Sequence, residues 1–322
     1  ISLSRNLPKL PFPQKASSMQ RLKAQQKIMN ALGSLEDELF PQRFALSDLR
    51  DIDRDILSER RILANNFELN DNEQAYLYSS DDESLRVLIN TEDHFKVTAS
   101  QAGNQLDTLL ASVEDIDSKM QQELTWSQSE KYGYLTACPL LIGSGCRALA
   151  LLNLTALDLL EKSPKIINAC SMMGWNLRSL TDSSENFPGN IYIISNQRTL
   201  GHQPKETVEK LNELITELRR QENAARRQLA YSSPEKLLDY IARPYGSLSF
   251  SHLAKPLESF HELMIIRTGT QLELLRNSSL IDVDQLITET MNAHLHGKNL
   301  LRHAEINIDQ LRSDKIKALL RD

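Results

Sequence analysis

The chain has 322 residues, of which 40% are hydrophobic and 25% charged, a composition typical of a soluble globular protein with one large or two ordinary domains. Its net charge of −6 argues against a nucleic-acid-binding protein, which needs clustered Lys and Arg. The apolar stretches are far shorter than the roughly 18 to 20 residues that cross a bilayer, and no secretion signal is recognisable. The sequence therefore predicts a cytoplasmic protein without membrane or nucleic acid as its main partner.

The first two thirds of the chain mix both kinds of secondary structure. Amphipathic spacing predicts helices, and aromatic or β-branched runs predict strands, in the chain order helix 19–35, helix 45–63, strand 75–80, strand 84–97, helix 104–124, strand 131–141, helix 147–163 and strand 189–197. The connections are too irregular for a doubly wound parallel sheet. They indicate an α+β fold, with an antiparallel sheet flanked by helices.

The last third is predicted to be helical. Pro204 opens a long amphipathic helix in which Val208, Leu211, Ile215 and Leu218 share one face. Further periodic segments follow, separated by prolines. We expect two domains, residues 1–230 with the sheet and residues 231–322 as an all-α C-terminal domain.

Two stretches combine residues that suggest chemistry. In "NTEDHFKV", strand alternation predicts that Glu92, His94 and Lys96 share one face, either as a surface ion pair with a surface histidine or as part of a polar cleft. In "LTACPLLIGSGCRALALLNL", Cys138 precedes a glycine turn and Arg147 follows it. The pattern lacks the lysine of a phosphate-binding loop, and glycines alone are weak evidence for one. The three cysteines are too few and too scattered for a disulfide framework or a zinc site.

Four stretches together resemble the motifs of the ATP:guanidino phosphotransferases, most closely the bacterial protein arginine kinase branch. They are "SRNLPKLPFP", "NTEDHFK", "GYLTACPLLIGSGCRAL" and "RSLTDSSENFPGNIYIISNQRTLG". The resemblance covers roughly residues 1 to 230. It implies the guanidino kinase catalytic fold and transfer of the γ-phosphoryl group of ATP, with Mg²⁺, to a guanidinium nitrogen.

The resemblance also implies roles for individual residues. Arg147 and Arg178 stand at phosphate-binding positions, with Arg147 at the start of the predicted helix 147–163. Glu92 stands at a carboxylate that orients the acceptor guanidinium, and Cys138 at the thiol beside it. Such a reaction needs cations around the triphosphate and carboxylates around the cationic acceptor, while the protein performs little covalent chemistry.

Three positions depart from the family pattern. Ser2 replaces the second arginine of the opening motif, whose first arginine would lie before Ile1, and Lys96 replaces another arginine of the nucleotide site. Ser183 stands where the second catalytic carboxylate belongs, a loss on the order of 10² to 10⁴ in rate if that group is the base. No metal-ligating residues are predicted.

Small-molecule members of the family carry a helical domain ahead of the opening motif, whereas the extra helical segment of this chain follows that motif, as in the protein arginine kinases. The position of the C-terminal segment therefore favours the protein arginine kinase branch. In that branch an Arg-Asp-x-x-Arg-Ala segment binds phosphoarginine; here "IDQLRSDKI" keeps Asp309 and Arg312, with Ile308 in place of the first arginine. The resemblance implies protein substrates, a zinc-binding activator, the Clp protease system and homodimerisation.

Two hypotheses from different classes follow. The chain is either a divergent protein arginine kinase with weakened catalysis, or a pseudokinase that acts as a regulatory or partner-binding subunit without nucleotide. A small-molecule arginine or creatine kinase is the less favoured third interpretation.

Overall fold

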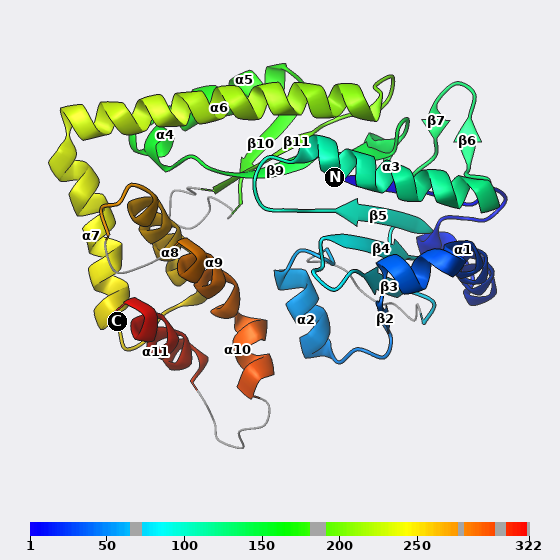
Figure 1. Cartoon of the computed structure of the whole chain (residues 1–322), viewed down its shortest axis with the longest axis horizontal. Helices are drawn as coiled ribbons and strands as arrows, with labels where there is room; N and C mark the ends of the chain where they lie inside the picture. The colour runs from blue at the N-terminus through cyan, green and yellow to red at the C-terminus, as the bar shows by residue number, and fades with distance from the viewer. Residues whose placement is uncertain (65–72, 181–190, 276–279, 300–306, 321–322) are drawn as a thin grey trace.

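The computed structural model describes residues 1–64, 73–180, 191–275, 280–299 and 307–320 (Figure 1). Its main element is an antiparallel sheet of six strands in the order β2-β3-β4-β5-β1-β8. These strands are β1 (Ser2–Arg5), β2 (Gln42–Ala45), β3 (Tyr76–Ser79), β4 (Leu85–Ile89), β5 (Phe95–Ala99) and β8 (Cys146–Arg147). A strand from the start of the chain is therefore paired between β5 and β8, which come about 90 and 140 residues later.

A second antiparallel sheet has the order β10-β11-β9, with β9 (Leu149–Asn153), β10 (Trp175–Ser179) and β11 (Ile191–Asn196). The chain passes from the first sheet into the second between β8 and β9. Asn196 fixes this passage, because its side-chain amide donates to the carbonyl of Cys146 at 3.0 Å and its Oδ1 accepts the N–H of Ala148 at 2.9 Å. A hairpin of β6 (Gln128–Ser129) and β7 (Gly133–Tyr134) projects beside the larger sheet.

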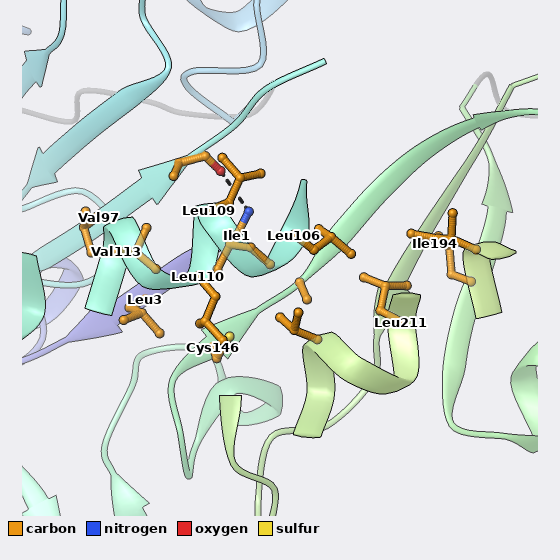
Figure 2. Close-up of a cluster of buried hydrophobic side chains, with 14 of the residues drawn as sticks. Ile1, Leu3, Val97, Leu106, Leu109, Leu110, Val113, Cys146, Ile194 and Leu211 are labelled. Atoms are coloured by element: carbon orange, nitrogen blue, oxygen red, sulfur yellow. Dashed lines mark hydrogen bonds between the residues drawn. The ribbon is translucent and has the colours of Figure 1, made fainter. Parts of the chain in front are cut away.

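Helices cover one face of the larger sheet. The buried side of α3 (Leu106–Glu123), with Leu106, Leu110 and Val113, belongs to the same hydrophobic cluster as Leu3 and Val97 of the sheet (Figure 2). The helix α6 (Pro204–Ser232) buries Val208, Leu211, Ile215 and Leu218, so the predicted amphipathic face is confirmed. The remaining helices of this region are α1 (Ser18–Leu39), α2 (Asp51–Glu59), α4 (Thr155–Leu159) and α5 (Ser163–Met172), with 3-10 turns η1 (Pro13–Lys15) and η2 (Pro139–Leu141).

The C-terminal region is helical, as predicted. It contains α7 (Pro234–Phe250), α8 (Pro256–Gln271), α9 (Leu280–Glu289), α10 (Asn292–Asn299) and α11 (Ile308–Leu320). A hydrophobic cluster of its own forms around Leu263, Ile266 and Ile316. The α+β fold followed by a helical C-terminal region is thus confirmed, while the domain boundary at residue 230 stays a prediction.

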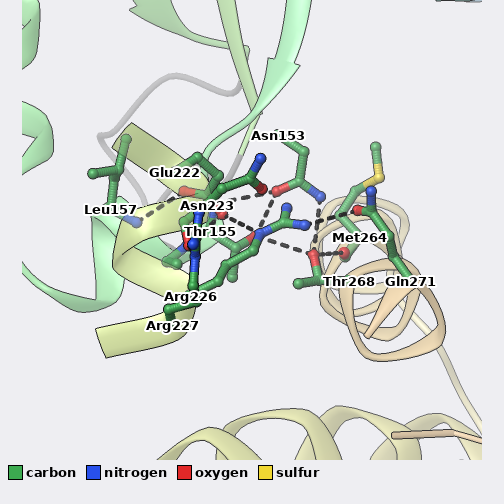
Figure 3. A network of polar contacts seen from close by, with 11 residues as sticks. Asn153, Thr155, Leu157, Glu222, Asn223, Arg226, Arg227, Met264, Thr268 and Gln271 are labelled. Carbon is green, nitrogen blue, oxygen red and sulfur yellow. Dashed lines mark hydrogen bonds and ion pairs between the residues drawn. The ribbon is translucent and has the colours of Figure 1, made fainter. Parts of the chain in front are cut away.

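Polar contacts at two places join the C-terminal helices to the rest of the described chain. In the first, Thr268 of α8 accepts a hydrogen bond from Asn153 at the end of β9 at 3.0 Å, and Arg226 of α6 donates to Gln271 at 3.1 Å (Figure 3). In the second, the carboxylate of Glu59 at the end of α2 accepts the N–H groups of Ala293 and His294 at the start of α10 at 2.8 and 3.1 Å. Figure 1 shows α10 beside α2.

Candidate active site

The register of the larger sheet gathers three of the predicted site residues on one face. Ser2 of β1 lies opposite Arg147 of β8, and Ser4 lies opposite Lys96 of β5. Directly opposed residues of antiparallel strands point to the same face, and alternate residues point to opposite faces. Ser2, Lys96 and Arg147 therefore share a face, which we call the cation-bearing face, whereas Leu3 points toward α3 on the other side.

The same face continues into the second sheet. Arg178 of β10 lies opposite Ile193, which in turn lies opposite Leu151 of β9. Side chains alternate along an extended chain, so Arg147 and Leu151 lie on one side and Ala148 on the other. Leu151 is 49% exposed and Ala148 is fully buried, so the side of Arg147 and Leu151 is the outward one. Arg178 is exposed and comes from an element about 30 residues after Arg147. The two sheets thus bring Arg147 and Arg178 to a common surface.

The extended chain at Arg147 corrects one expectation. Residues 147–163 were expected to form a helix beginning at Arg147, but Arg147 ends β8, Leu149–Asn153 forms β9, and a helix begins only at Thr155. Short apolar runs do not distinguish a buried strand from a helix, and here pairing with β1 and β11 decides for strand. Arg147 is therefore held by sheet register rather than by a helix N-terminus.

The glycine turn before Arg147 serves close packing. A Cβ atom on Gly145 would stand 2.6 Å from the carbonyl oxygen of Ser4, and one on Gly143 would stand 2.6 Å from that of Thr199. Both glycines also have positive φ angles, of 67° and 122°. The turn lets the loop from Cys138 to Arg147 lie against β1 and the segment after β11, with no phosphate-binding function needed to explain it.

Glu92 and Cys138 lie on two loops that are tied together by Asp93. The Oδ1 atom of Asp93 accepts hydrogen bonds from the side-chain amide of Asn6 at 2.6 Å and from the N–H of Ala137 at 2.7 Å. Asp93 is buried, whereas the neighbouring Glu92 is exposed and Cys138 is half-buried. Asp93 thus fixes the acidic loop that presents Glu92 against the loop that presents Cys138.

His94 corrects a second expectation, that Glu92, His94 and Lys96 alternate on one face of a strand. The strand β5 begins only at Phe95, and residues 90–94 form a turn. The ring of His94 is fully buried, and its Nδ1 accepts the N–H of Leu7 at 3.2 Å. Burial lowers the pKa of His94 to about 4, so its imidazole is neutral at pH 7. His94 is a structural acceptor and does not face Glu92.

The charges on the cation-bearing face are largely uncompensated. Lys96 Nζ lies 3.8 Å from Glu92 Oε2, a loose and half-exposed ion pair. Among the described residues, neither Arg147 nor Arg178 forms an ion pair or hydrogen bond through its guanidinium. Partial desolvation lowers the pKa of Arg61, just after α2, and the nearby charge of Arg178 lowers this pKa further. Such a concentration of unpaired cations favours an anionic ligand.

The sequence analysis missed Arg61 as a neighbour of this site. It lies in the predicted helix 45–63, and no local pattern links it to Arg178. The only hint in the sequence was the pair of adjacent arginines, Arg60 and Arg61, at the end of that helix. Ser183, the expected position of a lost carboxylate, lies outside the described residues.

Arg312 of α11 is fully buried and bound on all sides. Its Nε donates to the carbonyl of Thr290 at 2.8 Å, and its Nη1 donates to that of Ala254 at 2.5 Å and to Asp309 Oδ1 at 2.6 Å. Its Nη2 donates to the side chain of Asn292. Arg312 thus pairs with Asp309 within α11 and bonds to groups just before α8, just after α9 and at the start of α10. Their part in phosphoarginine recognition stays a prediction.

Two kinds of feature are absent from the described part of the chain. None of its helices is long and apolar enough to cross a membrane. None of its His, Cys, Asp and Glu side chains gather in groups of three or more that could hold a metal ion.

Comparison with known protein families matches residues 23–225 to the ATP:guanido phosphotransferase C-terminal catalytic domain and residues 234–322 to the protein-arginine kinase McsB C-terminal domain. Among curated proteins, the chain is 31% identical to the protein-arginine kinase of Clostridium acetobutylicum, covering 95% of this chain and 91% of that protein. It is 29% identical to the protein-arginine kinase of Shouchella clausii, covering 100% of this chain and 89% of that protein.

Solved structures agree on the fold. The substrate-free duplicated taurocyamine kinase of Schistosoma mansoni matches with a TM-score of 0.60 and 22% identity, covering 76% of this chain and 36% of that longer chain. A lombricine kinase matches with a TM-score of 0.58 and 22% identity, covering 70% of this chain and 66% of that chain.

The catalytic-domain match spans well over half of the chain, and the matched relatives span nearly all of it. Three of the four family motifs lie within the matched residues 23–225, and the helical C-terminal region agrees with the second match. The chain therefore belongs to the family of ATP-dependent guanidino phosphotransferases, as a homologue of the protein-arginine kinases.

Proposed function

We propose that the protein binds ATP with Mg²⁺ on the cation-bearing face and transfers the γ-phosphoryl group to arginine side chains of proteins. The observation that carries this proposal is the pair Arg147 and Arg178, which come from different sheets to one surface and have no carboxylate partner among the described residues. The protein substrates are inferred from the protein-arginine kinases that the chain resembles.

The proposed roles follow from the chemistry of the transfer. Arg147, Arg178 and Lys96 neutralise the triphosphate, whose negative charge spreads over its oxygens during transfer. The Glu92 carboxylate holds the cationic acceptor guanidinium, with the Cys138 sulfur beside it. The bond between the γ-phosphorus and the oxygen that bridges to the β-phosphate breaks, and ADP leaves. A P–N bond forms, and the proton that the acceptor nitrogen loses passes to the Glu92 carboxylate.

Mg²⁺ fits this site as a companion of the nucleotide. The ion would be held mainly by phosphate oxygens and water, as is common for Mg²⁺. It supplies charge neutralisation of the phosphates.

Catalysis is expected to be slower than in a site with two acceptor carboxylates. Ser183 stands where the resemblance places the second one, and Lys96 replaces a bidentate arginine with a single ammonium. If the missing carboxylate is the general base, the rate falls by about 10² to 10⁴.

The same departures favour one alternative, a pseudokinase that serves as a regulatory or partner-binding subunit. In that case the contacts of the helical C-terminal region persist while phosphoryl transfer is lost. Fold alone does not separate the two functions, because family members can keep a fold and lose a reaction.

The finer features of the proposal come from the resemblance. Residues 1–230 form the catalytic domain and residues 231–322 a domain that binds phosphoarginine through Asp309 and Arg312. The partners are a zinc-binding activator and the Clp protease system, in the cytoplasm, with the protein acting as a homodimer.

The proposal is tested by incubating the protein with γ-labelled ATP, Mg²⁺ and an arginine-rich protein, and measuring acid-labile phosphate on the acceptor. We expect the unaltered protein to transfer phosphate and the Glu92→Gln variant to transfer none. The exposed Glu235 on α7 provides the control, since Glu235→Gln should leave transfer unchanged. Absence of both transfer and ATP-dependent thermal stabilisation in the unaltered protein would reject the kinase function.

A gain-of-function variant tests the missing carboxylate directly. Ser183→Glu should raise transfer by about tenfold or more if that carboxylate is the main defect. The matched change Ser232→Glu at the exposed end of α6 should have no effect. No gain from Ser183→Glu would locate the defect among the arginines instead.

A further inference from the structure

Arg86 of β4 lies in the same transverse row of the sheet as Ser2 and Arg147. The register pairs Arg86 with Thr98, Thr98 with Ser2, and Ser2 with Arg147. All four side chains therefore belong to the cation-bearing face. Since neighbouring strands are about 4.8 Å apart, the backbone of Arg86 is about 10 Å from that of Ser2, a distance that an extended arginine side chain covers in large part.

Arg86 forms no ion pair among the described residues. The residue is 9% exposed, and its Nη2 donates to Ser100 Oγ at 2.6 Å. Glu83, the acidic residue whose charge acts on Arg86, forms an ion pair with Arg60. Burial lowers the pKa of Arg86, but an arginine stays protonated in proteins. A buried cation without an anion is costly, so the arrangement favours binding one.

An anion has access to Arg86. Arg86 lines a pocket of about 460 Å³, whose wall also includes Ser84, Ser100 and Gln101 and the carboxylates of Asp82 and Glu83. Both carboxylates have partners of their own. Along the row toward Ser2 the only intervening side chain is that of Thr98. Thr98 and Ser2 both have short side chains.

A second buried arginine shows that this arrangement is particular to Arg86. Arg5, three residues after Ser2, is 3% exposed, and its Nη2 lies 2.7 Å from Asp117 Oδ2. That charge is neutralised within the protein, on the opposite face of β1. Arg86 is equally enclosed, but its partner is a neutral hydroxyl.

We propose that Arg86 supplies, from across the sheet, the guanidinium that is missing at Ser2, and binds phosphate oxygens of the triphosphate. This inference rests on the proposed nucleotide site. It makes Arg86, Arg147 and Arg178 the phosphate-binding arginines of this chain.

The test measures binding of MgATP and of inorganic tripolyphosphate by titration calorimetry. Arg86→Met keeps the length and apolar stem of the side chain and should weaken both affinities by about 10- to 100-fold, the effect of losing charged hydrogen bonds. The swap Arg86→Ser with Ser2→Arg moves the guanidinium back to β1 and should restore affinity to within about threefold of the unaltered protein. Arg243→Met on α7, whose side chain is 78% exposed, is the control and should change nothing.

Urea unfolding of each variant establishes that it is folded. If Arg86→Met does not fold, Arg86→Lys serves in its place, because it keeps the charge and loses the planar fork; we expect about 3- to 10-fold weaker binding.

Each outcome decides between the two proposals. Equal affinities in the unaltered protein and Arg86→Met would overturn the role of Arg86 and leave the proposed function standing. Tripolyphosphate binding that depends on Arg86, without phosphoryl transfer, would support the phosphate site and reject the kinase function. Binding of neither anion to the unaltered protein would overturn both.

Discussion

Arg5 and Arg312 are enclosed by partners, whereas Arg147 and Arg178 have no carboxylate partner among the described residues. Arg5 bonds to both oxygens of Asp117, and Arg312 bonds to two carbonyls and two side chains. The difference teaches that burial requires compensation inside the protein, while a site for a charged ligand leaves cations uncompensated. Arginine thus stabilises the fold where it is buried and paired, and it is available to bind phosphate where it is unpaired.

The largest expected effect tests the scaffold side of this contrast. Arg5→Ala leaves the buried carboxylate of Asp117 without its cation and should lower the free energy of unfolding by about 3 to 5 kcal/mol, measured by urea denaturation. Arg243→Ala, which removes an exposed partner of Asp239, should cost less than about 0.5 kcal/mol. A similar small loss for both variants would show that the Arg5 pair contributes little.

The next effect concerns pH. The folded-state pKa of His94, about 4, lies below its ordinary value of 6.5, so the unfolded chain binds the extra proton first as pH falls. The stabilisation by neutral His94 is fully present above about pH 6.5 and is lost progressively toward pH 4, on the order of 3 kcal/mol in total.

The measurement compares unfolding free energies between pH 7 and pH 4.5. In His94→Asn, whose side-chain oxygen can still accept the Leu7 N–H, this part of the pH dependence should disappear. The exposed His202 gives the matched control His202→Asn, which should retain it. An unchanged slope in His94→Asn would assign the acid sensitivity to other groups.

A third prediction tests the ligand-binding side. Arg147→Ala should weaken MgATP binding by about 10- to 100-fold, because it removes a charged contact to phosphate, and should change stability by less than about 0.5 kcal/mol, because Arg147 has no partner to lose. Calorimetry and urea denaturation on the same samples measure both. A loss of stability comparable to that of Arg5→Ala would erase the distinction between the two classes of arginine.

The smallest effect is a gain. Lys96→Arg restores a bidentate fork and should strengthen MgATP binding by about 2- to 5-fold in the same titration. Lys119, which pairs with Asp115 on α3, offers the control Lys119→Arg, for which we expect no change. Unchanged or weaker binding in Lys96→Arg would show that Lys96 pairs with Glu92 and does not contact phosphate.

Much of the fold was predictable because its signals are local. The spacing of Val208, Leu211 and Ile215 indicated the buried side of α6, which the structure confirms. The site motifs were recognisable for the same reason, since Glu92, Cys138, Arg147 and Arg178 lie within short runs of characteristic residues. Their catalytic roles stay predictions.

The errors arose where local patterns admit two structures. The apolar run from Leu149 to Asn153 fits a helix or a strand, and its pairing with β11 makes it a strand. The alternation at Glu92, His94 and Lys96 suggested one strand, but a turn before Phe95 sends His94 into the interior. In both cases, contacts with distant segments outweighed the local preference.

The amino-acid order alone was enough to establish ancestry, the α+β class and a helical C-terminal region, because hydrophobic periodicity and short motifs are written along the chain. Which charges are neutralised and which remain free depends on strand register and burial. That is how the row from Arg86 through Thr98 and Ser2 to Arg147 emerges: hydrogen bonding between strands sets four distant residues side by side. No local sequence pattern predicts that these four residues are neighbours, because they come together only when the strands pair.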